Sequence, residues 1–181
     1  LSKEILLKIG LEQLSENPAM SKSWGNCLLL CNQASVTSNL TPSWEIVHEV
    51  LGNRLVGFFG PQHGFHSTVQ DNMIESDHGQ GPFGLPVYSL YSETREPSEE
   101  MLSEADTILI DIQIVGCRVY TFKYTIAACL RAAKKYGKKV KVKMINQKKS
   151  FLQRRLSSSI LNSEEILNKI EEKVMLSKFG L

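Results

Sequence analysis

Short apolar runs alternate with longer amphipathic segments between residues 26 and 144 of the chain. Runs without alternation are typical of strands covered on both faces, whereas alternation of apolar and polar residues indicates a half-buried strand. Four runs are of the first kind, and one segment alternates valine or methionine with lysine. We therefore predict strands at residues 26–31, 55–59, 85–90, 107–112 and 140–144.

Helical periodicity lies before, between and after these strands. Apolar residues three and four apart, together with capping signals, predict helices at residues 2–15, 42–51, 98–104, 119–136 and 163–179. Ser2 is the expected N-cap of the first helix, Pro42 lies in the first turn of the second, and Gly137 follows the fourth. Repeated strand–loop–helix order predicts an α/β fold with three layers and a mostly parallel sheet.

The segment from Leu55 to His66 joins a predicted strand to the most polar turn of this region. The apolar run ends at Gly60-Pro61, and Gln62, His63 and His66 follow. Ligands of open α/β sheets bind beyond the carboxyl ends of the strands. The loop at 66–84 is long enough to be either functional or disordered. We therefore expect functional side chains first of all within the stretch from Gln62 to His66.

Four predicted strand-end loops bring polar side chains to the same edge of the sheet. They contribute Asn32, Gln33, Gln62, His63, His66, Glu93, Arg95, Asp111, Gln113, Arg118 and Tyr120. Such a set suits a polar neutral or anionic ligand, for example a sugar acid. Either arginine could hold a carboxylate through two parallel hydrogen bonds.

Several of these residues also have a purely structural interpretation. His63 could hydrogen-bond loop backbone, while His66 and His78 could be solvated surface residues. A buried carboxylate at Asp111 must be paired, or must serve catalysis or ligand orientation, because an isolated buried charge is costly. Arg118 and the neighbouring Tyr120 could simply pack against the following helix.

Other chemistries lack the required motifs. No glycine-rich nucleotide fingerprint or P-loop follows the first strand, so no cofactor is expected. Glu75 and Asp77 have no partner at diagnostic metal-ligand spacing, and no metal is predicted. Ser89 lacks the Gly-x-Ser-x-Gly context of a hydrolase nucleophile. We interpret the four cysteines as small buried thiols, namely Cys27, Cys31, Cys117 and Cys129.

Composition is that of an ordinary soluble domain, with 42% hydrophobic and 22% charged residues. No apolar run approaches the ~18 residues of a membrane helix, and no signal peptide is visible. A start without Met suggests a fragment, so the compartment stays open between cytoplasm and export, and the oligomeric state is unknown.

The charge is distributed unevenly along the chain. Residues 1–133 hold 8 Lys and Arg against 15 Asp and Glu, whereas residues 134–181 hold 13 against 4. A basic end can bind nucleic acid, or it can be foreign to the fold. Between Lys134 and Arg155 only Tyr136 and Phe151 are aromatic, and no nucleic-acid module is present, so we do not predict nucleic-acid binding.

Read together, the strand-end loops resemble those of the bacterial exo-β-N-acetylmuramidase family. Four blocks in the same order carry the resemblance, namely Leu28–Ala34, Phe59–Phe65, Gly84–Tyr91 and Asp111–Thr121. Family members are about twice this length. The resemblance covers roughly residues 1–140, and it implies a Rossmann-like amino-terminal domain (1–145) whose cleft faces a smaller carboxyl-terminal domain that is absent here. It also implies release of N-acetylmuramic acid from the non-reducing ends of peptidoglycan fragments, and hence an amino-sugar or muropeptide ligand.

The chain departs from the family pattern at several positions. Many members have Glu where this chain has Gln62, and that Glu is the favoured acid; an amide cannot exchange the catalytic proton. Ile114 replaces an Asp, and the family's sequence after the last strand is missing beyond Asn146. We interpret residues 146–181 as a divergent basic and helical tail. One hypothesis is that a frame slip in lysine codons produced it.

The resemblance, taken with these residues, implies a division of roles. Catalytic roles are assigned to Gln62, His63 and Asp111. Substrate-binding roles are assigned to Asn32, Gln33, Glu93, Arg95, Gln113, Arg118 and Tyr120. Two functions remain: a glycoside hydrolase domain acting on muramic-acid sugars, or a non-catalytic fragment that binds them.

Overall fold

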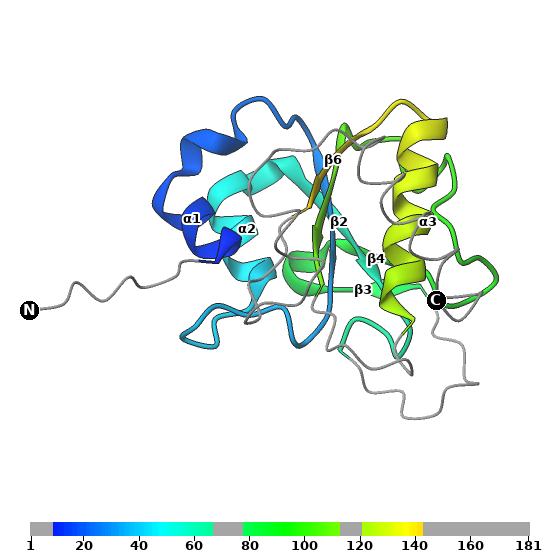
Figure 1. Cartoon of the computed structure of the whole chain (residues 1–181), viewed down its shortest axis with the longest axis horizontal. Coiled ribbons are helices and arrows are strands. Elements are labelled where there is room, and N and C mark those ends of the chain that lie inside the picture. Colours follow the sequence, from blue (N-terminus) through cyan, green and yellow to red (C-terminus); the bar gives the residue numbers. More distant parts are fainter. Residues whose placement is uncertain (1–8, 67–77, 113–120, 143–181) are drawn as a thin grey trace, which may run out of the picture.

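A six-stranded sheet forms the centre of the protein (Figure 1). The computed structural model describes residues 9–66, 78–112 and 121–142. The strands are β1 (Cys27–Cys31), β2 (Leu55–Gly60), β3 (Gly79–Gln80), β4 (Pro86–Ser89), β5 (Thr107–Asp111) and β6 (Lys139–Val142). Their order is β3-β4-β2-β1-β5-β6, and every neighbouring pair is parallel except β3 and β4. The five predicted strands are all present.

Helices cover both faces of this sheet. Helices α1 (Gly10–Glu16) and α2 (Ser43–Leu51) lie on one face, and α3 (Phe122–Lys135) lies on the other (Figure 1). Short 3-10 helices occupy Pro18–Ser21, Gly52–Arg54 and Pro82–Gly84. The predicted three-layer α/β fold with a mostly parallel sheet is therefore confirmed.

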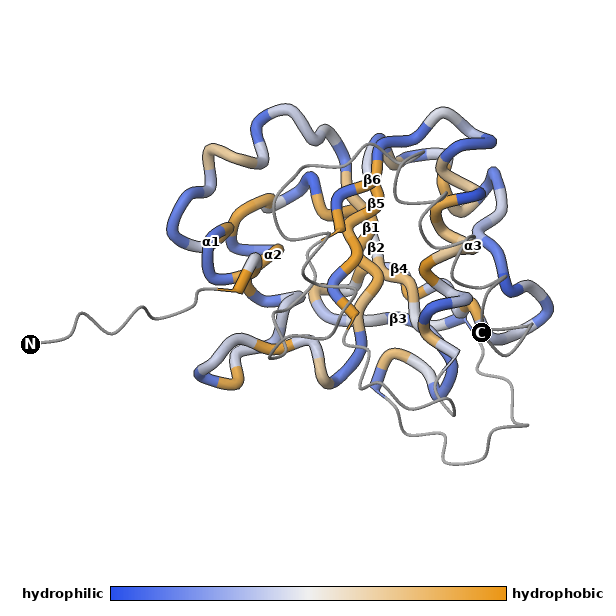
Figure 2. Tube along the Cα trace, viewed as in Figure 1, coloured by the Kyte–Doolittle hydropathy of each residue, from blue (hydrophilic) through white to orange (hydrophobic). Residues whose placement is uncertain are grey.

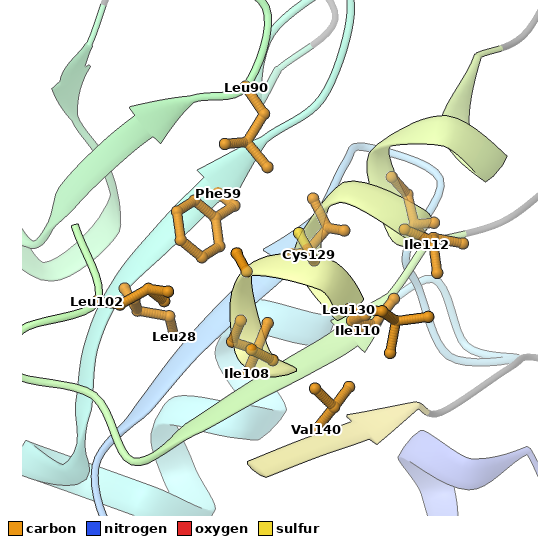
Figure 3. Close-up of a cluster of buried hydrophobic side chains, with 14 of the residues drawn as sticks. Leu28, Phe59, Leu90, Leu102, Ile108, Ile110, Ile112, Cys129, Leu130 and Val140 are labelled. Carbon is orange, nitrogen blue, oxygen red and sulfur yellow. The ribbon is translucent and has the colours of Figure 1, made fainter. Parts of the chain in front are cut away.

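The pleat of the strands divides the core between the two helical layers. In β1, Leu29 packs with the residues under α1 and α2, whereas Leu28 and Leu30 pack with those under α3. Because successive side chains point to opposite faces, an unbroken apolar strand is needed to fill both cores. Figure 2 shows the apolar strands running through the middle of the molecule, and Figure 3 shows Leu28 and Phe59 facing the buried side of α3, including Leu130.

Helix α3 is amphipathic, and its buried face packs against the sheet. Its buried face includes Ile126, Cys129 and Leu130, spaced three and four apart as an amphipathic helix requires. Gly137 has a φ of +65°, and the Lys138 N–H bonds to the Ala133 carbonyl at 2.8 Å. This is the closing bond of a Schellman motif, and it confirms Gly137 as the residue that ends the helix.

Three sequence predictions were wrong in detail. Ile9 is extended (φ −74°, ψ 158°), so no continuous helix runs through 2–15. Residues 99–104 form successive turns, with Leu102 N–H bonded to Glu99 O and Ser103 N–H to Glu100 O, because so short a segment gains little from its own helical hydrogen bonds. The predicted loop at 66–84 contains β3, which pairs with Val87 and Pro86 of β4. The predicted helix at 163–179 lies outside the described residues.

Candidate functional site

The strand order reverses at β1, and this defines the edge where a ligand would bind. The chain builds outward from β1 through β2 and β4 on one side, and then through β5 and β6 on the other. In doubly wound sheets the crevice beyond the carboxyl ends at such a switch point is the usual ligand site. The ends of β1 and β5 therefore mark one part of the candidate site.

A buried serine braces these two strand ends. Ser35 is 1% exposed; its hydroxyl accepts the Asn32 N–H at 3.1 Å and donates to the Asp111 carbonyl. The Asn32 side chain accepts the Ala34 N–H at 3.1 Å. Asn32 and Asp111, both predicted site residues, are thus drawn together at the switch point. The Asn32 amide closes its own turn, as an Asx turn does.

The Asp111 carboxyl group is buried beside a thiol. Asp111 is 3% exposed and Cys31 is fully buried. Burial raises the pKa of the Cys31 thiol, and the nearby Asp111 carboxylate raises it further. Cys31 is therefore a neutral thiol at physiological pH, and its burial agrees with the prediction for this residue.

The turn after β2 holds Gln62 and His63 in fixed positions. The Gly64 N–H bonds to the Pro61 carbonyl at 2.9 Å, and His63 has a φ of +72°, in the left-handed region. An added Cβ at Gly60 would lie 3.1 Å from the backbone nitrogen of Phe65, a tight contact that the turn would have to shift to relieve. A non-glycine residue in the left-handed region is uncommon, and such residues are frequent at ligand sites.

Gln62 lies inside the site, in contact with two hydroxyl groups. It is 5% exposed, the Thr121 hydroxyl donates to its Oε1 atom, and its Nε2 atom donates to the Tyr91 hydroxyl at 3.4 Å. Thr121 precedes α3, and Tyr91 follows β4. Three elements distant in sequence therefore meet at residue 62.

The segment after β4 adds a cation close to this contact. The Arg95 guanidinium carbon lies 3.6 Å from the centroid of the Tyr91 ring, a cation–π contact. Glu93 is exposed on the same segment. An ion pair between Glu96 and Arg131, at 3.1 Å, joins this segment to α3. Arg95 therefore lies next to Tyr91, which contacts Gln62.

The remaining predicted residues are dispersed. Gln33 is exposed, His66 is exposed with its ring edge against Phe65, and the Nδ1 atom of exposed His78 accepts the Ser89 N–H at 2.9 Å. His78 therefore has a structural hydrogen bond, so solvated surface is an incomplete description of it. Outside the described residues lie Glu75, Asp77, Gln113, Ile114, Cys117, Arg118 and Tyr120.

The sequence analysis missed three contacting residues. Ser35, Tyr91 and Thr121 were not among the predicted site residues, although the last two end two of the resembling blocks. Thr121 falls inside the helix predicted at 119–136, although α3 begins at Phe122, and Tyr91 would be taken for a half-buried loop residue. For Tyr91 and Thr121, position within a matching block was the one signal that could have identified them as site residues.

Within residues 9–66, 78–112 and 121–142, no group of three or more His, Cys, Asp or Glu side chains could hold a metal ion. None of the helices described is long and apolar enough to cross a membrane.

The fold and the strand-end loops together define a Rossmann-like α/β domain with a polar site at the switch-point edge. Residues 27–146 match the family described as "Exo-beta-N-acetylmuramidase NamZ, N-terminal". Because this match spans more than half of the chain, the chain belongs to that family.

Individual relatives agree with this assignment. The chain is 39% identical over 109 residues to "Peptidoglycan beta-N-acetylmuramidase NamZ" of Bacillus subtilis (strain 168), a match that covers 60% of this chain and 26% of the relative. Two crystal structures of DUF1343 family proteins from Bacteroides fragilis NCTC 9343 have similar folds. One has a TM-score of 0.66 at 33% identity, covering 78% of this chain and 35% of its own. The other has a TM-score of 0.55 at 26% identity, covering 75% and 34%. The chain thus spans about a quarter to a third of the length of these relatives.

Proposed function

We propose that this chain is the amino-terminal domain of an exo-β-N-acetylmuramidase, a glycoside hydrolase that releases N-acetylmuramic acid from the non-reducing ends of peptidoglycan fragments. The named activity of the Bacillus subtilis relative supports the substrate class. In this proposal the loops after β1, β2, β4 and β5 form the domain's side of the sugar-binding cleft. Residues 1–145 would be the domain, and 146–181 a separate tail.

The observation that carries the proposal is the placement of residue 62. Its side chain is buried beyond β2, between the hydroxyl groups of Thr121 and Tyr91. A hydroxyl group can donate or accept a hydrogen bond, so this position would hold a carboxyl group as well as an amide. It also adjoins the amino terminus of α3, where the helix dipole favours negative charge. The position can therefore hold a carboxyl group of a glycosidase, and in this chain it holds an amide.

Other side chains would bind the sugar in this proposal. Arg95 carries a guanidinium that can pair with the lactyl carboxylate of muramic acid, and Glu93 and Asn32 can accept or donate hydrogen bonds to sugar hydroxyls. His63, held in its turn beside Gln62, would orient a hydroxyl or assist proton transfer. Asp111 would supply the second carboxyl group or hold the loops together.

A non-catalytic function is favoured by one specific observation. The side chain in the buried position is an amide, which has no titratable proton near neutral pH. A chain with the same cleft and no acid would bind muramic-acid sugars without cleaving them.

An assay of para-nitrophenyl β-N-acetylmuramide hydrolysis distinguishes the two functions. It compares the rate of the full chain with the rate of its Gln62→Glu variant. The matched control is Gln80→Glu, which makes the same chemical change at an exposed position. Gln80 pairs with Pro86 at the amino-terminal end of β4, whereas residue 62 lies beyond the carboxyl end of β2. We expect Gln62→Glu to release nitrophenol at least tenfold faster than Gln80→Glu. If the unmodified chain instead releases nitrophenol faster than Gln62→Glu does, hydrolysis needs no carboxyl group at position 62.

If neither chain releases nitrophenol, binding decides between the two functions. A binding domain would be stabilised by N-acetylmuramic acid, with a rise in Tm that increases with ligand concentration. The absence of both turnover and stabilisation would contradict the proposal as a whole.

A further inference from the structure

Thr121 does not use its hydroxyl group in the way expected from its position. It is the N-cap residue of α3, where a threonine side chain ordinarily accepts a backbone N–H of the first turn. Here it forms no such bond, and its hydroxyl donates to Gln62 Oε1 instead. The contact joins residues 59 positions apart. The Thr121 hydroxyl therefore connects residue 62 to the start of α3 and does not cap the helix.

Tyr91 is the second partner, and it is itself held in place. Its backbone N–H bonds to Ser89 Oγ at 3.1 Å, and the adjacent Leu90 N–H bonds to the Gly60 carbonyl at 2.8 Å. The second bond attaches the segment after β4 to the end of β2, immediately before the turn that carries Gln62. Arg95 covers the face of the Tyr91 ring. The phenol is therefore fixed relative to residue 62 by backbone and side-chain contacts.

We propose that Thr121 and Tyr91 are positioning residues that form a two-hydroxyl cradle for the side chain at position 62. With glutamine, Thr121 donates to Oε1 and the Tyr91 oxygen accepts from Nε2. With glutamate, both hydroxyl groups can donate, one to each carboxylate oxygen, in the same geometry. The cradle therefore accepts either residue without rearrangement and fixes where its polar atoms lie.

The cradle also has a chemical consequence for an acid at this position. Burial disfavours the charged form of a carboxyl group and raises its pKa, whereas hydrogen bonds donated to the carboxylate lower it. Thr121 and Tyr91 would thus keep the pKa of the carboxyl group introduced by Gln62→Glu below the value that burial alone would set. This inference deepens the proposed function, since it names the residues that would tune its acid.

The test is a direct titration of that carboxyl group without ligand. In the full chain labelled with ¹³C at the side-chain carboxyl carbon of glutamate, Gln62→Glu adds one resonance, which a comparison with the unmodified chain assigns. We expect Tyr91→Phe or Thr121→Val, each combined with Gln62→Glu, to raise the titration midpoint by about one pH unit. Thr121→Ser retains the hydroxyl and should leave the midpoint unchanged.

The control is Tyr88→Phe, which removes a phenol oxygen from the neighbouring strand, where Tyr88 packs against the core under α3. The titration midpoint of the carboxyl group in Gln62→Glu combined with Tyr88→Phe should equal the midpoint in Gln62→Glu alone. Equal midpoints for Tyr91→Phe and Tyr88→Phe would overturn the role of Tyr91, and equal midpoints for Thr121→Val and Thr121→Ser would overturn that of Thr121. If Thr121→Val does not fold, the Tyr91→Phe comparison decides.

The cradle and the proposed function fail in different ways. Shifted midpoints in a protein that neither cleaves nor binds the muramide would establish the cradle and reject the function. Where Gln62→Glu is active, the alkaline limb of its kcat/KM profile should move upward with the midpoint in Tyr91→Phe. A profile that stays fixed while the midpoint moves would overturn the tuning role.

Discussion

Replacing Ser35 with alanine tests the brace at the switch point. Ser35 is 1% exposed, and its hydroxyl bonds both the Asn32 N–H, at 3.1 Å, and the Asp111 carbonyl. Ser35→Ala removes both bonds, together with the 3.2 Å contact of the hydroxyl with Asn32 Oδ1, and alanine offers no substitute. Loss of a partner by a buried polar group costs about 1–3 kcal/mol. We therefore expect the free energy of unfolding to fall by about 2–3 kcal/mol, allowing for partial relaxation of the turn.

Urea denaturation of the full chain measures this change, and a melting curve provides a second reading. For a chain of this size the expected loss corresponds to a fall in Tm of roughly 5–10 °C. The matched control is Ser103→Ala, an exposed serine whose hydroxyl donates to the Glu100 carbonyl within its own turn. Its effect should stay below about 0.5 kcal/mol. If the two variants differ by less than that, the switch-point brace does not stabilise the fold.

Two further substitutions test the other end of the sheet and a buried thiol. Gly25→Ala should destabilise the protein by about 2 kcal/mol more than Gly52→Ala, as measured by urea denaturation. Both glycines have positive φ, but an added Cβ at Gly25 would lie 2.2 Å from the Asp106 carboxyl, whereas nothing lies within 4 Å at Gly52; equal effects would contradict the predicted clash. Burial raises the pKa of Cys27 to about 12, despite the opposing charge of Arg54, so the unfolded chain loses this proton first as the pH rises. The stability contributed by the neutral thiol should therefore be intact below pH 9, fall by about 1 kcal/mol by pH 10, and continue to fall towards pH 12. Cys27→Ala should show a shallower decline over this range, and identical pH profiles would refute the shift.

The pattern of apolar residues was sufficient for most of the secondary structure. The run at 107–112 became β5, and the amphipathic segment ending before Gly137 became α3. These elements depend on local periodicity and on helix-terminating residues, both of which can be seen along the sequence. The shortest predicted helix was not found, because a segment such as 98–104 gains too little from local hydrogen bonds to settle its own conformation.

The candidate site was predicted in part. Gln62, Asn32 and Asp111 lie at the strand ends, as the parallel topology required. The contact of Asp111 with Ser35 and the contacts of Gln62 could not be predicted, because each joins residues distant in sequence. Thr121 is the clearest example: the sequence predicts only that it belongs to a helical segment, and the contact of its hydroxyl with Gln62 exists only in the tertiary structure.

The sequence by itself determined the layers: unbroken apolar strands require cover on both faces, and amphipathic helices provide it. The tertiary structure decided which strands pair and which side chains are in contact. The two-residue strand β3 has no pattern of its own, and it exists because β4 offers a free edge for pairing. Likewise, Gln62 lies between Thr121 and Tyr91 because the strand order places β2 beside β4 and the start of α3 near both. Local periodicity specifies which segments are buried, but the identity of each contact depends on chain crossovers that periodicity does not encode.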